Sequence, residues 1–378
     1  MAGIYIHIPF CKQACHYCNF HFATSLHYKN DLITALLKEV ELQKNYLQQD
    51  PVETIYFGGG TPSLCTKDEL GNILTAIREH FPVATDAEIT LEANPDDINE
   101  EHLVSWRAAG ITRLSIGIQS FFEEDLRWMN RAHTASQASE NLELATRHFD
   151  NITIDLIYGT PGLTNEKWQA NVMKALSLNI PHLSCYALTV EPKTPLDKMI
   201  QKHQSKDVDP DQQSEQFLLL MQWLGDAGYE HYEISNFAKP GWRSRHNSSY
   251  WSGGTGAKSK NYLGLGPSAH SFNGETRQWN IANNNAYIKS INEGSVPYEK
   301  EELTPTQQLN EYIMTSLRTM EGINEELLRS VFAVDTEGFR KKIKKYTDNG
   351  LALQRGSFFA LTREGKLLAD GIAADLFY

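Results

Sequence analysis

The sequence lacks several features that would direct a protein into a membrane or onto nucleic acid. None of its apolar runs approaches the roughly 18 residues of a membrane-spanning helix. The opening residues, MAGIYIHIPF, lack the basic and long apolar segments of a secretory signal. Lys and Arg number 35 against 47 Asp and Glu, and a formal charge of −12 argues against nucleic-acid binding through charge alone. We therefore expect a cytoplasmic protein without a nucleic-acid partner, with contact to a membrane surface left open.

Cysteine is also scarce, with five residues in a chain of 378. An odd number in a chain without an expected secretory signal argues against a disulfide framework. Cys11, Cys15 and Cys18 lie close together in the segment CKQACHYC. Such a trio can hold one structural zinc ion with a fourth ligand, or a [4Fe–4S] cluster whose remaining iron is free for a substrate. The candidates for a fourth zinc ligand are His16, His21 and Cys65.

Short β-branched and aromatic segments alternate with amphipathic helical patterns in the first part of the chain. The predicted strands cover residues 4–8, 54–57, 88–92, 113–118, 152–158 and 183–188. Residues 31–48, after the first strand, carry apolar side chains near a period of 3.6, which predicts a helix. Successive strand–helix units imply a parallel sheet with right-handed crossovers, either doubly wound or closed into most of a barrel.

Unusual residues lie at the ends of these predicted strands. The cysteines follow the first strand and GGGTP follows the second, while Glu92, Gln119 and Ala187 end later ones and Asp155 lies in the fifth. In a barrel these ends share one mouth, where the fold carries its chemistry, whereas a doubly wound sheet more often uses a single switch point. We therefore predict an α/β fold, a partial (β/α)6 TIM-like barrel over residues 1–235.

The pattern changes after about residue 235. Residues 246–280 are rich in Gly, Ser and Asn, which predicts irregular loop with short strands. Within them, SGGTGAKSKN predicts a surface insertion and not a nucleotide loop, because Ala257 occupies a position that needs glycine. Helical patterns return from residue 305 and are followed by a hairpin pattern around 351–362. We predict a connecting region over 236–303 and a C-terminal, mainly helical, winged-helix-like domain over 304–378.

The segment YIHIPFCKQACHYCNF resembles the signature of radical S-adenosylmethionine (SAM) proteins, in the family that contains oxygen-independent coproporphyrinogen III oxidase. The segments YFGGGTPS, LEANPDD, RLSIGIQSF, MNRAH and IDLIYGTPG follow in the family's order, so the resemblance covers nearly the whole chain. It implies that Cys11, Cys15 and Cys18 ligate a [4Fe–4S] cluster, whose open iron is chelated by the amino and carboxylate groups of SAM. An electron from the cluster then cleaves the sulfonium bond and yields a 5′-deoxyadenosyl radical.

The resemblance also implies a set of SAM-binding residues. Taken singly, such residues are more often barrel hydrogen-bonding groups or tight-turn glycines, but together they match the family's cofactor positions. They are Tyr5, Tyr17, Gly59, Gly60, Thr61, Glu92, Gln119, Arg131, Asp155 and Ala187.

Two departures from the oxidase pattern resemble the haem chaperone branch of this family. Oxidases typically carry a fourth cysteine in a Cys-x-Cys ending and an N-terminal arm, whereas here Phe20 occupies that position and only ten residues precede Cys11. The segment HNSSYW is similar to the HNxxYW haem motif of the branch. A neutral imidazole is a common axial iron ligand, although a histidine that caps a loop beside two anchoring rings is the alternative. The resemblance implies a haem site at His246, Asn247, Tyr250 and Trp251.

We therefore predict a haem chaperone that delivers haem to haem proteins such as respiratory cytochromes, with a [4Fe–4S] cluster, SAM and haem as its cofactors. An oxygen-independent coproporphyrinogen III oxidase, which forms protoporphyrinogen IX, is the alternative. An interaction module with structural zinc is a third interpretation. The sequence leaves open whether the protein forms a homodimer.

Overall fold

The computed structural model describes residues 2–251 and 261–378. Its core is a run of parallel strands that pair in sequence order, each with its neighbour. These strands are β1 (Ala2–Ile8), β2 (Val52–Gly59), β3 (Val83–Ala93), β4 (Arg113–Gln119), β5 (Ile152–Tyr158) and β6 (His182–Ala187). They confirm the predicted strands and the α/β fold class with a parallel sheet.

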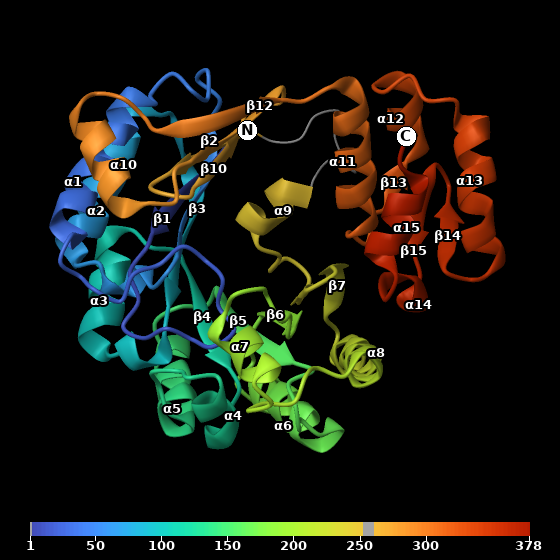
Figure 1. The fold of residues 1–378 in the computed structure, drawn as a ribbon, viewed down its shortest axis with the longest axis horizontal. Coiled ribbons are helices and arrows are strands. Elements are labelled where there is room, and N and C mark those ends of the chain that lie inside the picture. The colour runs from blue at the N-terminus through green and yellow to red at the C-terminus, as the bar shows by residue number, and fades with distance from the viewer. Residues whose placement is uncertain (1, 252–260) are drawn as a thin grey trace.

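Helices cover the outer face of the curved sheet (Figure 1). They are α1 (Lys29–Leu42), α2 (Lys67–His80), α3 (Glu100–Ala109), α4 (Glu123–Trp128), α5 (Ala135–Thr146), α6 (Asn165–Ser177) and α8 (Pro210–Asp226), with short 3-10 turns at Pro62–Leu64 and Pro95–Asp97. Helix α7 (Pro195–Gln201) instead lies at the carboxyl end of the strands, where the Leu196 amide donates to the His16 carbonyl at 2.9 Å. Thr66 and Thr134 begin α2 and α5 with capping boxes. The prediction for the first helix extended too far, because the chain turns after Leu42, although Leu47 remains buried.

The sheet continues beyond the parallel core at both edges. On one side β9 (Asn261–Leu265) pairs in parallel with β1, and antiparallel strands follow: β10 (His270–Phe272), β11 (Thr276–Asn280) and β12 (Tyr298–Glu302). Helix α10 (Asn284–Asn292) packs against α1. On the other side β8 (Asn236–Ala238) pairs antiparallel with β6, and β7 (Glu230–Glu233) pairs antiparallel with β8. The short strands expected within residues 246–280 are therefore present as β9, β10 and β11.

The expectation of an irregular loop is wrong at the HNSSYW segment, which forms the short helix α9 (Arg245–Trp251). Local pattern does not favour a helix there, and the contacts that hold α9 come from distant strands, as described below. Figure 1 shows α9 between the sheet and the C-terminal helices, and it packs against both β2 and α11. The predicted insertion at 252–261 lies outside the described residues except for Asn261, which begins β9.

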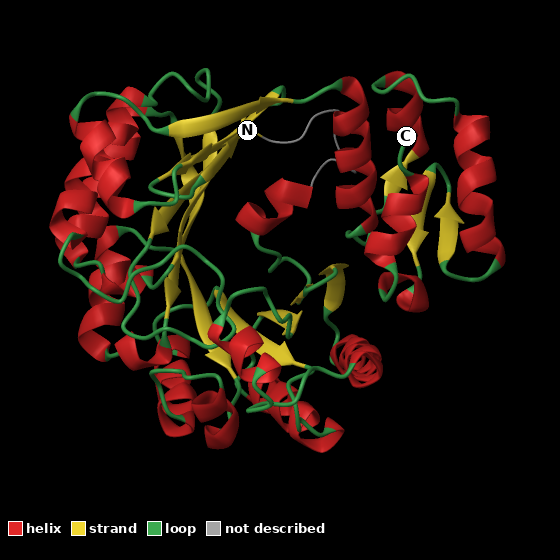
Figure 2. Cartoon of the chain, in the orientation of Figure 1, coloured by secondary structure: helices red, strands yellow, loops and turns green. Residues whose placement is uncertain are grey.

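The C-terminal residues form a separate layer of helices around a small antiparallel sheet (Figure 2). Its elements are α11 (Pro305–Leu317), β13 (Ile323–Asn324), α12 (Glu325–Ser330), α13 (Thr336–Asp348), β14 (Ala352–Arg355), β15 (Phe358–Leu361), α14 (Arg363–Lys366) and α15 (Ala369–Leu376). The order of helices and hairpin agrees with the winged-helix-like prediction. The exact domain boundaries at 235 and 303 stay a prediction.

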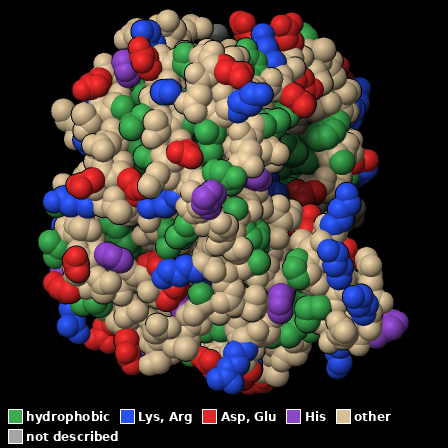
Figure 3. Space-filling model, turned by 60° about the vertical axis from the view of Figure 1, so that its left-hand side comes forward, with side chains coloured by type: hydrophobic (Ala, Val, Ile, Leu, Met, Phe, Trp, Pro, Cys, Tyr) green, Lys and Arg blue, Asp and Glu red, His purple; other side chains and the backbone are tan. Residues whose placement is uncertain are grey.

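Surface charge is mixed in sign. On the face drawn in Figure 3, Lys and Arg side chains are interspersed with Asp and Glu. The basic run of α13 follows this pattern, because Lys341, Lys344 and Lys345 pair with acidic side chains of the same domain. In the part of the chain that the structure describes, no helix is both long and apolar enough to cross a membrane.

Candidate functional site

The interior of the barrel is polar, in contrast to the branched apolar layers common in closed (β/α) barrels. Each core strand alternates an apolar side chain, packed toward the helices, with a polar one directed inward. In β1, for example, Ile4, Ile6 and Ile8 are fully buried, and Tyr5 lies between them on the cavity side. The inward polar set from the other strands includes Tyr56, Glu92, Arg113, Ser115, Thr153, Asp155, His182 and Ser184.

A cavity of about 440 Å³ lies at the carboxyl ends of these strands. It brings together every predicted cluster and SAM residue except Tyr5. Those in its wall are Cys11, Cys15, Tyr17, Cys18, Gly59, Gly60, Thr61, Glu92, Gln119, Arg131, Asp155 and Ala187. Tyr5 lines an adjoining smaller cavity instead. Residues from six separate strand ends therefore meet in one place, as expected of a barrel mouth.

The cysteine segment is anchored over this cavity by hydrogen bonds at both ends. The Cys11 amide donates to the Ala23 carbonyl at 3.0 Å, and the His16 amide donates to the Met129 carbonyl at 3.0 Å. Arg131 Nη1 lies 3.3 Å from the Cys15 sulfur. Burial raises the pKa of the Cys11 thiol to about 11, so an adjacent cation such as Arg131 or bound iron is needed to favour the thiolate.

The thiols fit a multi-iron cluster better than a single zinc ion. Among the described residues, no three Cys, His, Asp or Glu side chains converge closely enough to hold one ion. The candidate fourth zinc ligands are also engaged elsewhere: His16 Nδ1 with the Trp128 carbonyl at 2.8 Å and His21 Nε2 with Asn284 at 2.7 Å. Cys65 is buried outside the cavity wall. The cysteines instead border an open space, as a cluster with a free iron requires.

The glycine segment after β2 crosses the start of the cysteine segment at backbone contact distance. The Gly60 amide donates to the Ile8 carbonyl at 2.9 Å, and the Thr61 amide donates to the Phe10 carbonyl at 2.7 Å. A Cβ atom on Gly60 would lie 2.6 Å from the Phe10 carbonyl oxygen. Gly59 has a φ of +105°, which favours glycine. Glycine is therefore needed here to place the two segments side by side.

Charged groups of both signs face the cavity. Glu92 accepts hydrogen bonds from Tyr56 OH at 2.8 Å and from the Gly59 amide at 3.2 Å, and burial raises its pKa to about 7. Burial likewise raises the pKa of Asp155 to about 6. Arg131 donates from Nη2 to Asn94 at 2.7 Å, while its buried Nε has no hydrogen-bond partner within the described residues. The orphaned donor and the two carboxyls suit a ligand that carries both an amine and a carboxylate, as SAM does.

Three of the predicted haem residues, His246, Asn247 and Tyr250, line a smaller adjoining chamber of about 220 Å³ that shares Glu92 and Asp155 with this cavity. Trp251 is not part of its wall. His246 is only 3% exposed. Its Nδ1 is hydrogen-bonded to Thr54 Oγ1 at 2.8 Å and its Nε2 to Tyr250 OH at 3.0 Å. Burial lowers the pKa of the imidazole to about 3, so the ring is neutral. Both ring nitrogens thus have partners inside the barrel.

The remaining motif residues connect α9 to its surroundings. Asn247 Nδ2 donates to Tyr232 OH on β7 at 3.2 Å, and Trp251 Nε1 donates to Asn247 Oδ1 at 3.2 Å. The Arg318 guanidinium, at the end of α11, lies 5.1 Å from the centroid of the Trp251 ring. The motif therefore joins the barrel, its edge strands and the C-terminal domain.

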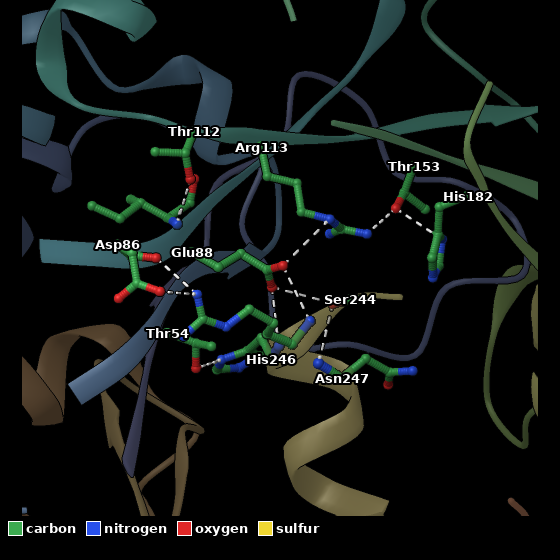
Figure 4. A network of polar contacts seen from close by, with 12 residues as sticks. Thr54, Asp86, Glu88, Thr112, Arg113, Thr153, His182, Ser244, His246 and Asn247 are labelled. Atoms are coloured by element: carbon green, nitrogen blue, oxygen red, sulfur yellow. Dashed lines mark hydrogen bonds and ion pairs between the residues drawn. The ribbon is translucent and has the colours of Figure 1, made fainter. Parts of the chain in front are cut away.

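Sequence analysis missed Glu88, which holds α9, and Arg113, which faces Glu88 from the neighbouring strand (Figure 4). Glu88 accepts from the backbone amides of Arg245 and His246 at 3.1 and 3.0 Å, and Arg113 Nε lies 4.0 Å from the same carboxylate. A signal existed: in the EITLE and RLSIGI segments polar residues recur at every second position of otherwise buried strands. That period places Glu88 and Arg113 on the inward face.

The three-cysteine segment at the mouth of a partial (β/α) barrel, opposite a glycine turn, defines a radical SAM protein. The Radical SAM superfamily model matches residues 5–174, and the HemN C-terminal domain matches residues 303–368. The solved coproporphyrinogen III oxidase HemN from Escherichia coli covers 100% of this chain and 90% of its own, with a TM-score of 0.85 and 24% identity. That likeness establishes the fold.

Curated relatives narrow this class. Heme chaperone HemW of Bacillus subtilis is 33% identical over 98% of both chains. HemW of Escherichia coli is 30% identical over 98% of this chain and 96% of its own. HemW of Mycobacterium tuberculosis is 33% identical over 99% of this chain and 94% of its own. The chain belongs to the HemW family of radical SAM proteins.

Proposed function

We propose that the protein is a haem chaperone that binds haem and delivers it to haem proteins such as respiratory cytochromes. Similarity to proteins named HemW over nearly the full length carries the proposal. The HNSSYW motif and Phe20, in place of a fourth clustered cysteine, support the same branch. Phe20 is 67% exposed at the cavity wall, where it presents an apolar surface and no further thiolate.

The cavity residues are proposed to hold a [4Fe–4S] cluster and SAM. The cluster would be held by Cys11, Cys15 and Cys18, and when bound it supplies an electron able to cleave the SAM sulfonium bond. Arg131 would offset thiolate charge at Cys15, and its unpartnered Nε could donate to an anionic group of the ligand. The Glu92 carboxylate suits an amine or ribose hydroxyl.

The other residues proposed to bind SAM line the same cavity, except Tyr5, which lines the adjoining smaller chamber. Gly59, Gly60 and Thr61 bring main chain close to the ligand, and Ala187 and Tyr17 exclude water around it. Tyr5, Gln119 and Asp155 supply further polar groups.

We propose His246 as a ligand of haem iron, with Asn247, Tyr250 and Trp251 around it. Iron needs a free lone pair on one imidazole nitrogen, so coordination requires that His246 leave either Thr54 or Tyr250. The haem-bound arrangement of α9 therefore differs from the one described above. The proposal places the protein in the cytoplasm, with its acceptor there or at a membrane surface.

Two variants test the assignments separately after anaerobic reconstitution. Cys15→Ala is expected to lose iron, sulfide and the brown chromophore while circular dichroism stays that of the wild type. His246→Ala is expected to weaken haem binding while iron and sulfide content stay unchanged. His148→Ala, at a half-buried histidine that pairs with Glu100, serves as the control for His246. An unchanged haem Soret spectrum and affinity in His246→Ala would remove that residue from the haem site.

Light scattering on the reconstituted protein decides whether it forms a homodimer. If the wild type has twice the mass of one chain and Cys15→Ala has the mass of a single chain, dimerisation depends on the cluster. A monomer in both samples would remove the homodimer from the proposal.

A further inference from the structure

The haem motif is held inside the barrel by residues that belong to neither the proposed cluster nor the proposed SAM site. Glu88, on β3, accepts hydrogen bonds from the first amides of α9, those of Arg245 and His246. Thr54, on β2, fixes Nδ1 of the imidazole at 2.8 Å, and the ring stacks on Tyr56 with centroids 4.9 Å apart. Figure 4 shows Glu88 and Thr54 pointing toward α9 from adjacent strands.

The strongest contacts of Glu88 are those with α9. A carboxylate that is 5% exposed requires compensation by hydrogen bonds or opposite charge. Arg113 supplies opposite charge, but its Nε is 4.0 Å away and has no hydrogen-bond partner within the described residues. The Arg113 guanidinium instead donates to Thr153. The two shortest hydrogen bonds to Glu88, at 3.0 and 3.1 Å, therefore come from the backbone of α9, and a longer one at 3.4 Å comes from Ser244 Oγ, just before the helix.

The space beside His246 does not accept haem in this arrangement. The adjoining chamber measures about 220 Å³, below the roughly 300–1,000 Å³ of pockets that enclose drug-sized ligands. Both imidazole nitrogens are also occupied. The His246 imidazole therefore has to leave its position in the barrel before it can coordinate haem iron.

We propose that Glu88 is a positioning residue that keeps α9 in the barrel, and that haem is captured from a second state in which α9 has left Glu88 and Thr54. This inference rests on the proposed function, in which His246 ligates haem iron. When only a fraction of molecules is competent to bind, the apparent affinity falls by that fraction. A substitution that weakens the contacts of α9 with the barrel therefore raises the fraction of competent molecules and strengthens haem binding.

The test compares Glu88→Gln with a control on the same strand, β3, whose side chain also pairs with a residue of α9. Gln keeps the size of Glu88 but lacks the charge and presents one amide group to two backbone donors, so α9 is released more often. We expect haem affinity to rise about tenfold, since hydrogen bonds to charged groups are worth at least that factor. Asp86→Asn removes only the exposed pair with the Arg245 side chain and is expected to bind haem as the wild type does.

Two readouts are taken on the full-length protein. Haem affinity is measured by Soret titration, and access to His246 in haem-free protein is measured by diethylpyrocarbonate modification and mass spectrometry. We expect His246 of Glu88→Gln to be modified faster, in parallel with the rise in affinity. Should Glu88→Gln fail to fold, Thr54→Val removes the imidazole hydrogen bond alone and serves the same comparison.

Equal modification rates in the variant and the wild type would overturn the role of Glu88. Faster modification with unchanged haem affinity would overturn the inference that withdrawal of α9 limits haem capture. Failure of the proposed function gives a different result: His246→Ala would bind haem as tightly as the wild type. The diethylpyrocarbonate rates would then still report whether Glu88 holds α9.

Discussion

Replacing Gly60 by alanine tests the close crossing of the glycine and cysteine segments. The added Cβ would lie 2.6 Å from the Phe10 carbonyl oxygen, 2.7 Å from that of Ile8 and 2.8 Å from the Phe10 amide nitrogen. All three neighbours are backbone atoms that take part in this crossing, so no side chain can rotate away. Overpacking costs about 1–3 kcal/mol where side chains adjust, and we expect at least about 3 kcal/mol here.

The assay pairs urea unfolding of the apo-protein with iron and sulfide analysis after anaerobic reconstitution. Gly60→Ala is expected to lower the free energy of unfolding and to bind less cluster, because the cysteine segment moves off the cavity. Gly71→Ala in α2 is the matched control, since its Cβ meets nothing within 4 Å. That substitution should stabilise the helix by about 0.5–1 kcal/mol. A Gly60→Ala protein with wild-type stability and full cluster content would refute the account of this crossing.

Three further predictions concern charge. SAM affinity should fall about tenfold per pH unit below about 7, because burial raises the pKa of Glu92 to about 7 and protonation removes the carboxylate. Anaerobic equilibrium dialysis measures this affinity, and a wild-type affinity that does not change with pH would contradict the prediction. Glu39 is fully buried and its pKa is raised from 4.5 to about 7, so the folded state retains a proton that the unfolded state loses. As the pH rises from 4.5 to about 7, the free energy of unfolding of the wild type should therefore fall relative to that of Glu39→Gln, by at most about 3 kcal/mol. Urea unfolding that gives parallel pH profiles for the two proteins would refute this. Arg318→Ala, which removes the cation over the Trp251 ring together with its ion pair to the buried Glu233, should lower the free energy of unfolding by at least about 1–2 kcal/mol. Lys341→Ala, at an exposed helical pair, should change it little, and equal effects of the two variants would count against these contacts of Arg318.

The sequence was sufficient for the parallel core because its strands are short, β-branched and bounded by turns. Ile4, Ile6 and Ile8 repeat at the strand period and are fully buried. The cysteine and glycine segments were identifiable because their chemistry depends on local spacing. Their meeting in one cavity followed from the shared mouth of a barrel.

Features held by distant contacts escaped prediction. Helix α9 has no amphipathic pattern, and its position depends on Glu88 and Thr54, which lie about 160 to 190 residues away in the sequence. The HNSSYW segment was chosen as a haem site for its residue types, but spacing cannot show that His246 faces inward with both nitrogens engaged. The end of α1 was also misplaced, because Leu47 continues the apolar pattern from a turn.

The most direct test of the proposed function is a haem titration beside an anaerobic coproporphyrinogen III assay, both on the same reconstituted sample. The account predicts that the protein binds haem, passes it to an apo-cytochrome and leaves coproporphyrinogen III unchanged. Formation of protoporphyrinogen IX without haem transfer would contradict it and assign the chain the oxidase activity instead.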